Sequence, residues 1–200
     1  MEFCKFTAHF VALSAIENAL LPNSFEVGVT FSVNTPNVHE QNIAFQRVKH
    51  LVNEELNCTI IVHKTNPIFK SVNKFQNKVV VLPDDGPDWL LSCALLFKLN
   101  AIVEGRFTIN QVEVNSSLGD HISYYAIWEA KDIVAESLNE LPAADRWWNS
   151  ADISFNRFQK FNTWKAVGLD WQLTKQTQDA NIEKIIQFKP KILKGGSSNN

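Results

Sequence analysis

The sequence predicts an α+β protein in which an antiparallel sheet carries two long helices on one face. Residues 25–33 (FEVGVTFSV) alternate apolar with polar side chains, which is typical of a strand with one buried face. Apolar residues recur at three- and four-residue steps over residues 37–56, as they do in an amphipathic helix. An almost wholly apolar segment, 89–103, then precedes two more strand-like segments, which predicts a second helix laid on a hairpin.

The segments before the first helix are expected to form two strands joined by a long connection. Residues 2–11 alternate loosely and predict a strand with both faces partly covered. Residues 12–24 are interpreted as the connection, because they end in the turn-like segment 21–24 (LPNS). The clearest strand, 25–33, follows directly.

Asn37 is predicted to cap the first long helix, with Glu40 three residues later as its reciprocal partner. After this helix, the apolar residues 58–62 (CTIIV) predict a short strand. Residues 63–67 (HKTNP) have the composition of a turn. The polar, lysine-containing residues 69–77 predict a loop.

The second long helix, residues 89–103, follows a short strand at 79–82. Few polar residues interrupt this helix, so other parts of the protein must bury nearly its whole surface. Gly105 is expected to end it, because glycine accepts the left-handed backbone conformation at a helix C-terminus. Residues 107–114 and 122–127 then predict the two strands of the hairpin.

Three aspartates cluster at the expected start of this helix: Asp84, Asp85 and Asp88. Acidic side chains stabilise the positive end of a helix dipole. A metal would need further oxygen ligands, and the neighbouring sequence does not offer them. We therefore interpret the three aspartates as stabilising the helix.

A C-terminal extension is expected beyond a core domain of residues 1–128. Residues 129–141 predict a helix that Pro142 ends. The stretch that follows is rich in Trp and Phe, which need a surface to cover them, so residues 129–194 are interpreted as a mixed helical and aromatic extension packed on the core or on a neighbouring subunit. Residues 195–200 (GGSSNN) predict a flexible tail.

Composition and charge favour one main domain in the cytoplasm. The chain has 200 residues, 45% of them hydrophobic, and a formal net charge of −2, which gives no whole-protein reason to bind nucleic acid or an anionic membrane. Its 3 cysteines lie far apart among apolar neighbours, as buried reduced thiols do. No uninterrupted apolar segment reaches the roughly 20 residues that span a bilayer. We expect a cytoplasmic protein with no membrane contact and no nucleic-acid partner.

Five short segments, in this order, carry a resemblance to a known family. Residues 6–9 (FTAH) look like an opening F-x-A-x-H motif with the histidine shifted by one position, and residues 25–33 look like the strand that follows it. Residues 61–66 (IVHKTN) are similar to an L-D-H-x-x-L-N segment. Residues 85–101 stand where a P-T-x-E-N helix is expected, and residues 112–125 where two last strands carry an E-T or E-S pair. The chain thus resembles T-fold proteins of the 6-pyruvoyl-tetrahydropterin synthase and 6-carboxytetrahydropterin synthase (QueD-like) family.

The resemblance covers roughly residues 3–127 and implies a T-fold whose subunits assemble into a ring with ligand pockets between them. It also implies that several functional groups are missing. The family holds zinc with three histidines, of which only His9 has a counterpart, so no zinc site is expected. The catalytic cysteine is absent, Val62 replaces an aspartate, and about Ser116 replaces the acidic residue that anchors a pterin ring. The chain resembles a family member that keeps the scaffold and has lost the zinc-dependent chemistry.

The leading hypothesis is a non-catalytic homo-oligomer that binds a small planar ligand of the pterin or purine type, or a protein partner. Its candidate ligand-binding residues are His9, His63, Ser116 and Ser117. No metal ligands and no cofactor are expected.

Two alternatives stay open. His63 with Thr65, and His121 with Ser123, match the paired H-x-(S/T) motifs of 2H phosphoesterases, in which His63 and His121 would act as acid and base on a phosphodiester. The other is an interaction protein, such as a phage-encoded accessory or anti-host factor. Its partner would contact the aromatic residues of the C-terminal extension, namely Trp147, Trp148, Trp164 and Trp171.

Overall fold

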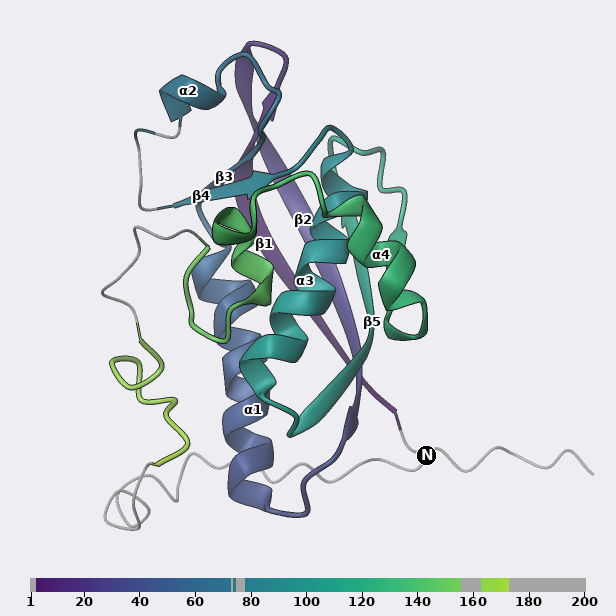
Figure 1. The fold of residues 1–200 in the computed structure, drawn as a ribbon, viewed down its shortest axis with the longest axis vertical. Coiled ribbons are helices and arrows are strands. Elements are labelled where there is room, and N and C mark those ends of the chain that lie inside the picture. The colour runs from purple at the N-terminus through teal and green to yellow at the C-terminus, as the bar shows by residue number, and fades with distance from the viewer. Residues whose placement is uncertain (1–2, 73, 75–77, 156–162, 173–200) are drawn as a thin grey trace, which may run out of the picture.

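The structure is a computed structural model that describes residues 3–72, 74, 78–155 and 163–172 (Figure 1). Its described residues form one six-stranded sheet with the strand order β4-β3-β1-β2-β5-β6. The strands are β1 (Cys4–Ile16), β2 (Ala19–Val33), β3 (Thr59–His63), β4 (Val79–Leu82), β5 (Phe107–Ser116) and β6 (Tyr124–Ile127). Two long helices, α1 (Val38–His50) and α3 (Pro87–Val103), lie on one face of this sheet (Figure 1). The α+β class predicted from the sequence is confirmed.

The sheet is mixed, which corrects the prediction of an antiparallel one. The strands β1, β2, β5 and β6 pair antiparallel, whereas β3 runs parallel to β1 and β4 runs parallel to β3. Parallel neighbours need a long connection: β2 and the segment with α1 lie between β1 and β3 along the chain, and residues 64–78 lie between β3 and β4. The two parallel strands extend the sheet beyond the edge of β1, where they form one side of the pocket described below.

The hairpin of β1 and β2 is longer than the sequence predicted. Residues 12–24, interpreted as a connection, instead continue both strands and leave a two-residue turn at 17–18. Pro22 is accepted there because β5 pairs with β2 only from Phe25 onward, so this part of β2 has a free edge. The hairpin therefore projects past the rest of the sheet.

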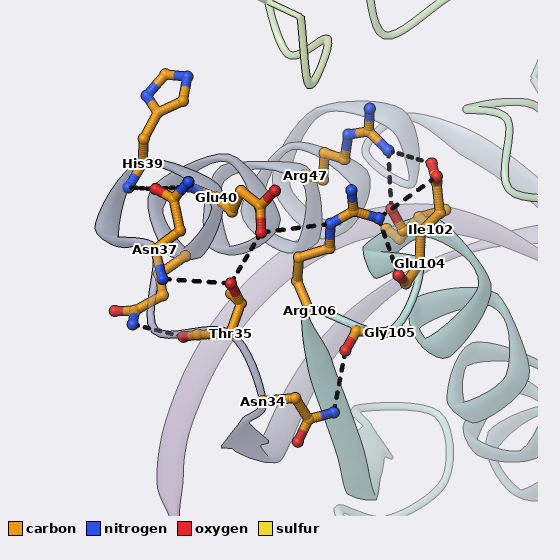
Figure 2. Close-up of polar contacts among 11 residues, drawn as sticks. Asn34, Thr35, Asn37, His39, Glu40, Arg47, Ile102, Glu104, Gly105 and Arg106 are labelled. Carbon is orange, nitrogen blue, oxygen red and sulfur yellow. Dashed lines mark hydrogen bonds and ion pairs between the residues drawn. The ribbon is translucent and has the colours of Figure 1, made fainter.

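The first turn of α1 is capped as predicted, but with a different partner for Glu40. The Asn37 side chain accepts hydrogen bonds from the backbone N–H groups of His39 (3.0 Å) and Glu40 (3.4 Å). The Glu40 carboxylate does not reach back to Asn37. It accepts a bond from the Thr35 hydroxyl at 2.8 Å and lies 3.8 Å from Arg106 (Figure 2).

The second long helix, α3, is the centre of the hydrophobic core. It starts at Pro87 after Gly86, whose φ is 100°, and Leu91, Leu95 and Leu99 on it have no exposed surface. Gly105 was predicted to end the helix in a left-handed conformation, and it does so with a φ of 79°. The left-handed turn begins one residue earlier, at Glu104, with a φ of 47°.

Arg47 of α1 joins the far end of α3 to residues 163–172. Its guanidinium, only 2% exposed, donates to the Ile102 carbonyl (3.0 Å) and to Glu104 (2.8 Å) (Figure 2), and the Trp171 ring stacks on it at 3.8 Å. Burial lowers the pKa of Arg47, and the ion pair with Glu104 opposes this effect. These contacts attach residues 163–172 to the helical layer.

Lys98, fully buried on α3, binds residues 147–154 of the C-terminal extension. Its ammonium donates to the main-chain carbonyls of Trp147 (3.2 Å), Ser150 (3.0 Å) and Ser154 (2.9 Å), and lies 3.4 Å from Asp152. Burial lowers the pKa of Lys98 to about 8. One buried cation therefore joins α3 to three main-chain carbonyls of the extension.

The aromatic residues proposed to contact a protein partner are mostly buried inside the chain, which corrects that hypothesis. Trp147, Trp148 and Trp164 are 5%, 2% and 8% exposed and belong to the same core cluster as α3. Trp171 stacks on Arg47. Side chains without free surface cannot carry a docking site, because their apolar area is already removed from water.

Shorter elements complete the described residues. The helix α2 (Phe69–Val72) lies in the segment predicted as a loop, and α1 continues into a π-helical turn at Leu51–Glu55. A 3₁₀ turn (Trp128–Ala130) and α4 (Lys131–Ser137) stand where one helix was predicted.

Two more 3₁₀ turns, Ala143–Asp145 and Trp147–Asn149, follow α4. No helix in the described part of the chain is long and apolar enough to cross a membrane. The predicted tail, 195–200, and the part of the extension beyond residue 172 lie outside the described residues.

Candidate ligand-binding pocket

A pocket of about 400 Å³ lies where the tip of the β1–β2 hairpin meets the ends of β3 and β4 and the start of α3. The hairpin contributes Ser14 and Asn23, and β3 contributes His63. The loop between β5 and β6 closes the remaining side with Ser116, Leu118 and Gly119. We call this the Asp88 pocket, because Asp88 and Trp89 line it from the first turn of α3.

Asp88 is a buried carboxyl group with one satisfied and one unsatisfied oxygen. It is 5% exposed, and its Oδ2 accepts a hydrogen bond of 2.7 Å from the Ser116 hydroxyl. Its Oδ1 is buried and has no hydrogen-bond partner among the described residues. Burial raises the pKa of Asp88, and the hydrogen bond from Ser116 only partly opposes this.

Gly119 lets the β5–β6 loop approach this carboxyl group closely. A Cβ atom at Gly119 would collide with Asp88 Oδ2, so no larger residue fits without moving the loop. The Gly119 backbone N–H donates to the Ser116 hydroxyl oxygen at 3.1 Å, which orients the serine toward Asp88. The loop and the first turn of α3 thus support each other.

Asn23 links the hairpin to the same loop. Its Nδ2 donates to Ser14 Oγ (3.1 Å), and its Oδ1 accepts from the Ser117 hydroxyl (2.9 Å) and from the Leu118 backbone N–H (3.1 Å). Both polar ends of the buried amide are therefore occupied. Ser14 is 2% exposed, and because its oxygen acts as the acceptor for Asn23, its own hydroxyl hydrogen can still be donated.

His63 stands at the pocket wall in a defined orientation. Its Nε2 lies 3.3 Å from the Asn66 Nδ2, and its Nδ1 lies 2.8 Å from the Thr65 hydroxyl oxygen. The amide nitrogen is a donor, so the tautomer that fits carries the proton on Nδ1 and donates it to Thr65. The Thr65 hydroxyl is in turn 3.5 Å from Asp84 Oδ1.

Charges at the pocket have one dominant sign. The lining includes four acidic residues, which are Glu17, Asp84, Asp85 and Asp88, and no lysine or arginine among the described residues. Trp89 and Tyr124 add aromatic surface.

A second, more open pocket of about 360 Å³ contains the other predicted residues. His9 and His121 line it together with Glu26, whose Oε2 lies 3.7 Å from His9 Nε2. Among the described residues, no three His, Cys, Asp or Glu side chains are grouped so that they could hold a metal ion.

The predicted site residues thus separate into two groups. His63 and Ser116 line the Asp88 pocket, and Ser117 contributes to it indirectly through Asn23. His9 and His121 line the other pocket, so the structure does not bring His63 and His121 into one pocket.

Sequence reasoning missed the two residues with the most specific geometry. Asp88 was interpreted as stabilising the helix dipole, and Asn23 was placed in a turn. The structure shows that Asp88 supplies a carboxyl group directly at Ser116. The only signal in the sequence is that a polar residue follows Pro87 in an otherwise apolar helix, and this signal is shared by many ordinary helix starts.

Comparison with known proteins gives a likeness in fold. No protein-family model and no curated protein matches the sequence. The structure is similar to that of an uncharacterized protein from Wolinella succinogenes, with 10% identity and a TM-score of 0.42 over 64% of this chain and 99% of that one. It is also similar to a catalytic-residue mutant of Plasmodium vivax 6-pyruvoyltetrahydropterin synthase, with 12% identity and a TM-score of 0.39 over 63% of this chain and 98% of that one. A likeness of this strength says nothing about what the chain binds.

Proposed function

We propose that this protein binds a small planar heterocycle of the pterin or purine type in the Asp88 pocket. The observation that carries the proposal is Asp88 Oδ1, a buried acceptor that has no partner among the described residues. Leaving a buried polar group unpaired costs about 1–3 kcal/mol, more for a charged one. A ligand N–H group that reaches Oδ1 removes this cost, so the cost becomes part of the binding free energy.

The other lining groups suit a flat ring with polar edges. The Ser14 hydroxyl offers a donor and Asp88 Oδ1 an acceptor, which match a ring edge that carries both a carbonyl or ring nitrogen and an N–H. Trp89 and Tyr124 offer faces on which a ring can stack. A volume of about 400 Å³ lies in the range of small-molecule pockets, which is roughly 300–1,000 Å³.

Titration calorimetry with a panel of pterin, guanosine, adenosine and xanthine tests the proposal. At least one ring is expected to bind the wild-type protein, and Asp88→Asn is expected to weaken that binding at least about tenfold, because an amide N–H there opposes a ligand N–H. Asp132→Asn is the matched control, since Asp132 is an exposed aspartate on α4. No heat of binding from any ring, or equal binding by the Asp88 variant, would contradict the proposal.

We further propose that copies of the chain associate through the sheet edge at β6. The outer edge of β6 is unpaired among the described residues, and its residues Tyr124, Tyr125 and Ile127 are exposed. A natural edge strand normally carries a charge, a proline or a bulge that blocks pairing, and β6 (YYAI) has none. The opposite edge strand, β4, has the same length of 4 residues, but Trp147 Nε1 donates to its outward-facing Val81 carbonyl at 3.0 Å, so β6 is the edge that a neighbouring copy can pair with.

Size-exclusion chromatography with light scattering tests the association. The wild-type protein is expected to elute as an oligomer, and Ile127→Lys, which places a charge on the edge, is expected to shift it toward the monomer. A wild-type protein that is monomeric at all concentrations would contradict this part of the proposal.

A further inference from the structure

We infer that the ligand of the Asp88 pocket is neutral or positively charged and carries no phosphate group. This inference rests on the proposed function and deepens it by naming the charge class of the ligand. It starts from the observation that every charged side chain lining the pocket in the described structure is a carboxyl group, with His63 as the only basic residue.

The acidic groups are arranged around the entrance as well as at the floor. Glu17 lies at the hairpin turn, and Asp84 and Asp85 lie in the connection from β4 to α3; all three are exposed. Asp88 lies deeper and is buried. A ligand therefore passes three carboxylates before its ring reaches Asp88 Oδ1, and like charges brought together in this way disfavour the wrong partner.

The start of α3 offsets only part of this negative field. A helix N-terminus binds phosphate through free N–H groups and the positive end of its dipole. Here Pro87 has no N–H, the Gly86 N–H is bonded to the Asp85 side chain at 2.8 Å, and Leu90 donates back to Gly86, which leaves only the N–H groups of Asp88 and Trp89 in the first turn. Asp88 itself lies in the first turn, where an acidic side chain already offsets the positive end of the helix dipole.

The same features favour a ring with several N–H groups, including one that is protonated. Asp88 Oδ1 accepts from the ring edge, the acidic entrance attracts positive charge, and the aromatic faces of Trp89 and Tyr124 bind flat or cationic groups. Nucleobases, nucleosides and unphosphorylated pterins belong to this class. Nucleotides and pterin phosphates do not.

Paired ligands that differ only in a phosphate test the inference. Binding of guanosine and its monophosphate, and of neopterin and its phosphate, is measured by titration calorimetry at low ionic strength, where charge effects are largest. The phosphorylated member of each pair that binds is expected to be weaker by roughly tenfold or more. Replacing both entrance aspartates (Asp84→Asn with Asp85→Asn) is expected to strengthen binding of the phosphorylated compound. The difference in affinity between the two members of a pair should then become smaller, whereas Asp132→Asn should leave this difference unchanged.

The outcomes separate this inference from the proposed function. If the phosphorylated compound binds as tightly as its parent and Asp88→Asn still weakens the binding of both, the inference is overturned and the proposed function stands. If the phosphorylated compound binds more weakly than its parent but the double variant does not reduce this difference in affinity, the entrance carboxylates are not its cause. The inference is then also overturned. If no ring binds with or without phosphate, the proposed function fails and this inference fails with it.

Discussion

Asp88→Asn is expected to make the protein more stable at neutral pH while it weakens ligand binding. In the wild-type protein, the carboxyl group is buried, and its Oδ1 has no partner among the described residues. The amide variant has nearly the same shape, keeps an oxygen that accepts the Ser116 hydroxyl bond, and carries no charge. The change therefore tests whether the chain retains a costly buried group that a ligand can satisfy.

The magnitude follows from the cost of burying an unpaired polar group, which is about 1–3 kcal/mol. The variant still buries an amide group without a full set of partners, so only part of this cost is recovered. We expect the free energy of unfolding to rise by about 1 kcal/mol at neutral pH, which corresponds to an increase in Tm of about 2–4 °C for a chain of this size.

The difference between variant and wild type is expected to grow with pH. Burial raises the pKa of Asp88 above its ordinary value of 3.8, so the folded state holds this proton more tightly than the unfolded state does. The contribution of the protonated group to stability is complete below pH about 4 and is lost as pH rises through the folded-state pKa. Wild type and variant should therefore be nearly equal in stability near pH 4 and should diverge above it.

Urea unfolding and calorimetric melting at several pH values measure this difference, with Asp132→Asn as the exposed control. A variant that is less stable than wild type at every pH would refute the reasoning, because it would mean that Asp88 Oδ1 has a stabilising partner. A constant difference across the pH range would also refute it, because the pH dependence requires the raised pKa.

Three further predictions concern the groups that support the pocket and the C-terminal extension. Gly119→Ala should push the loop away from Asp88, lower the free energy of unfolding by about 1–3 kcal/mol and weaken ligand binding, as unfolding and titration measurements will show. Lys98→Met should cost at least about 2 kcal/mol in urea unfolding at neutral pH, because it removes the donor to the partly buried carbonyls of Ser150 and Ser154. Since the pKa of Lys98 is lowered to about 8, the wild type should gain stability relative to that variant as pH rises from about 8 to about 10, and a flat difference would contradict this. Trp171→Ala should cost about 1–2 kcal/mol and should speed proteolysis within residues 163–172, because it removes the ring stacked on Arg47; unchanged cleavage there would contradict the anchoring role.

The parts of the fold that could be predicted from the sequence are those in which local pattern and tertiary environment agree. The alternation in 25–33 and the cap at Asn37 identify β2 and α1, because a half-buried strand and an amphipathic helix each impose a period on the sequence. The apolar segment of α3 is equally clear, because a helix buried on all sides needs apolar residues on all sides. The second strand pair, β5 and β6, follows from the same alternation.

The parts that could not be predicted depend on pairing between distant segments. The hairpin tip at 12–24 contains small and polar residues with a proline, so its local composition indicates a turn, and only its partner strand makes it extended. The parallel direction of β3 depends on where the chain enters the sheet after α1. Neither the extended conformation of the hairpin tip nor the direction of β3 produces a periodic pattern of apolar residues in the sequence.

The candidate site shows the same limit at the level of a single hydrogen bond. Ser116 stands where the resembled family carries an acidic anchor, and from the sequence this serine argued that the anchor is lost. In the structure its hydroxyl donates to Asp88, so a carboxyl group is present at the site but belongs to another element. That contact requires the first turn of α3 to meet the β5–β6 loop, which in turn requires Gly119 at the point of closest approach. Because 28 residues separate Asp88 from Ser116 along the chain, no local pattern relates them, and the carboxyl group could be found only after the fold had brought the two elements together.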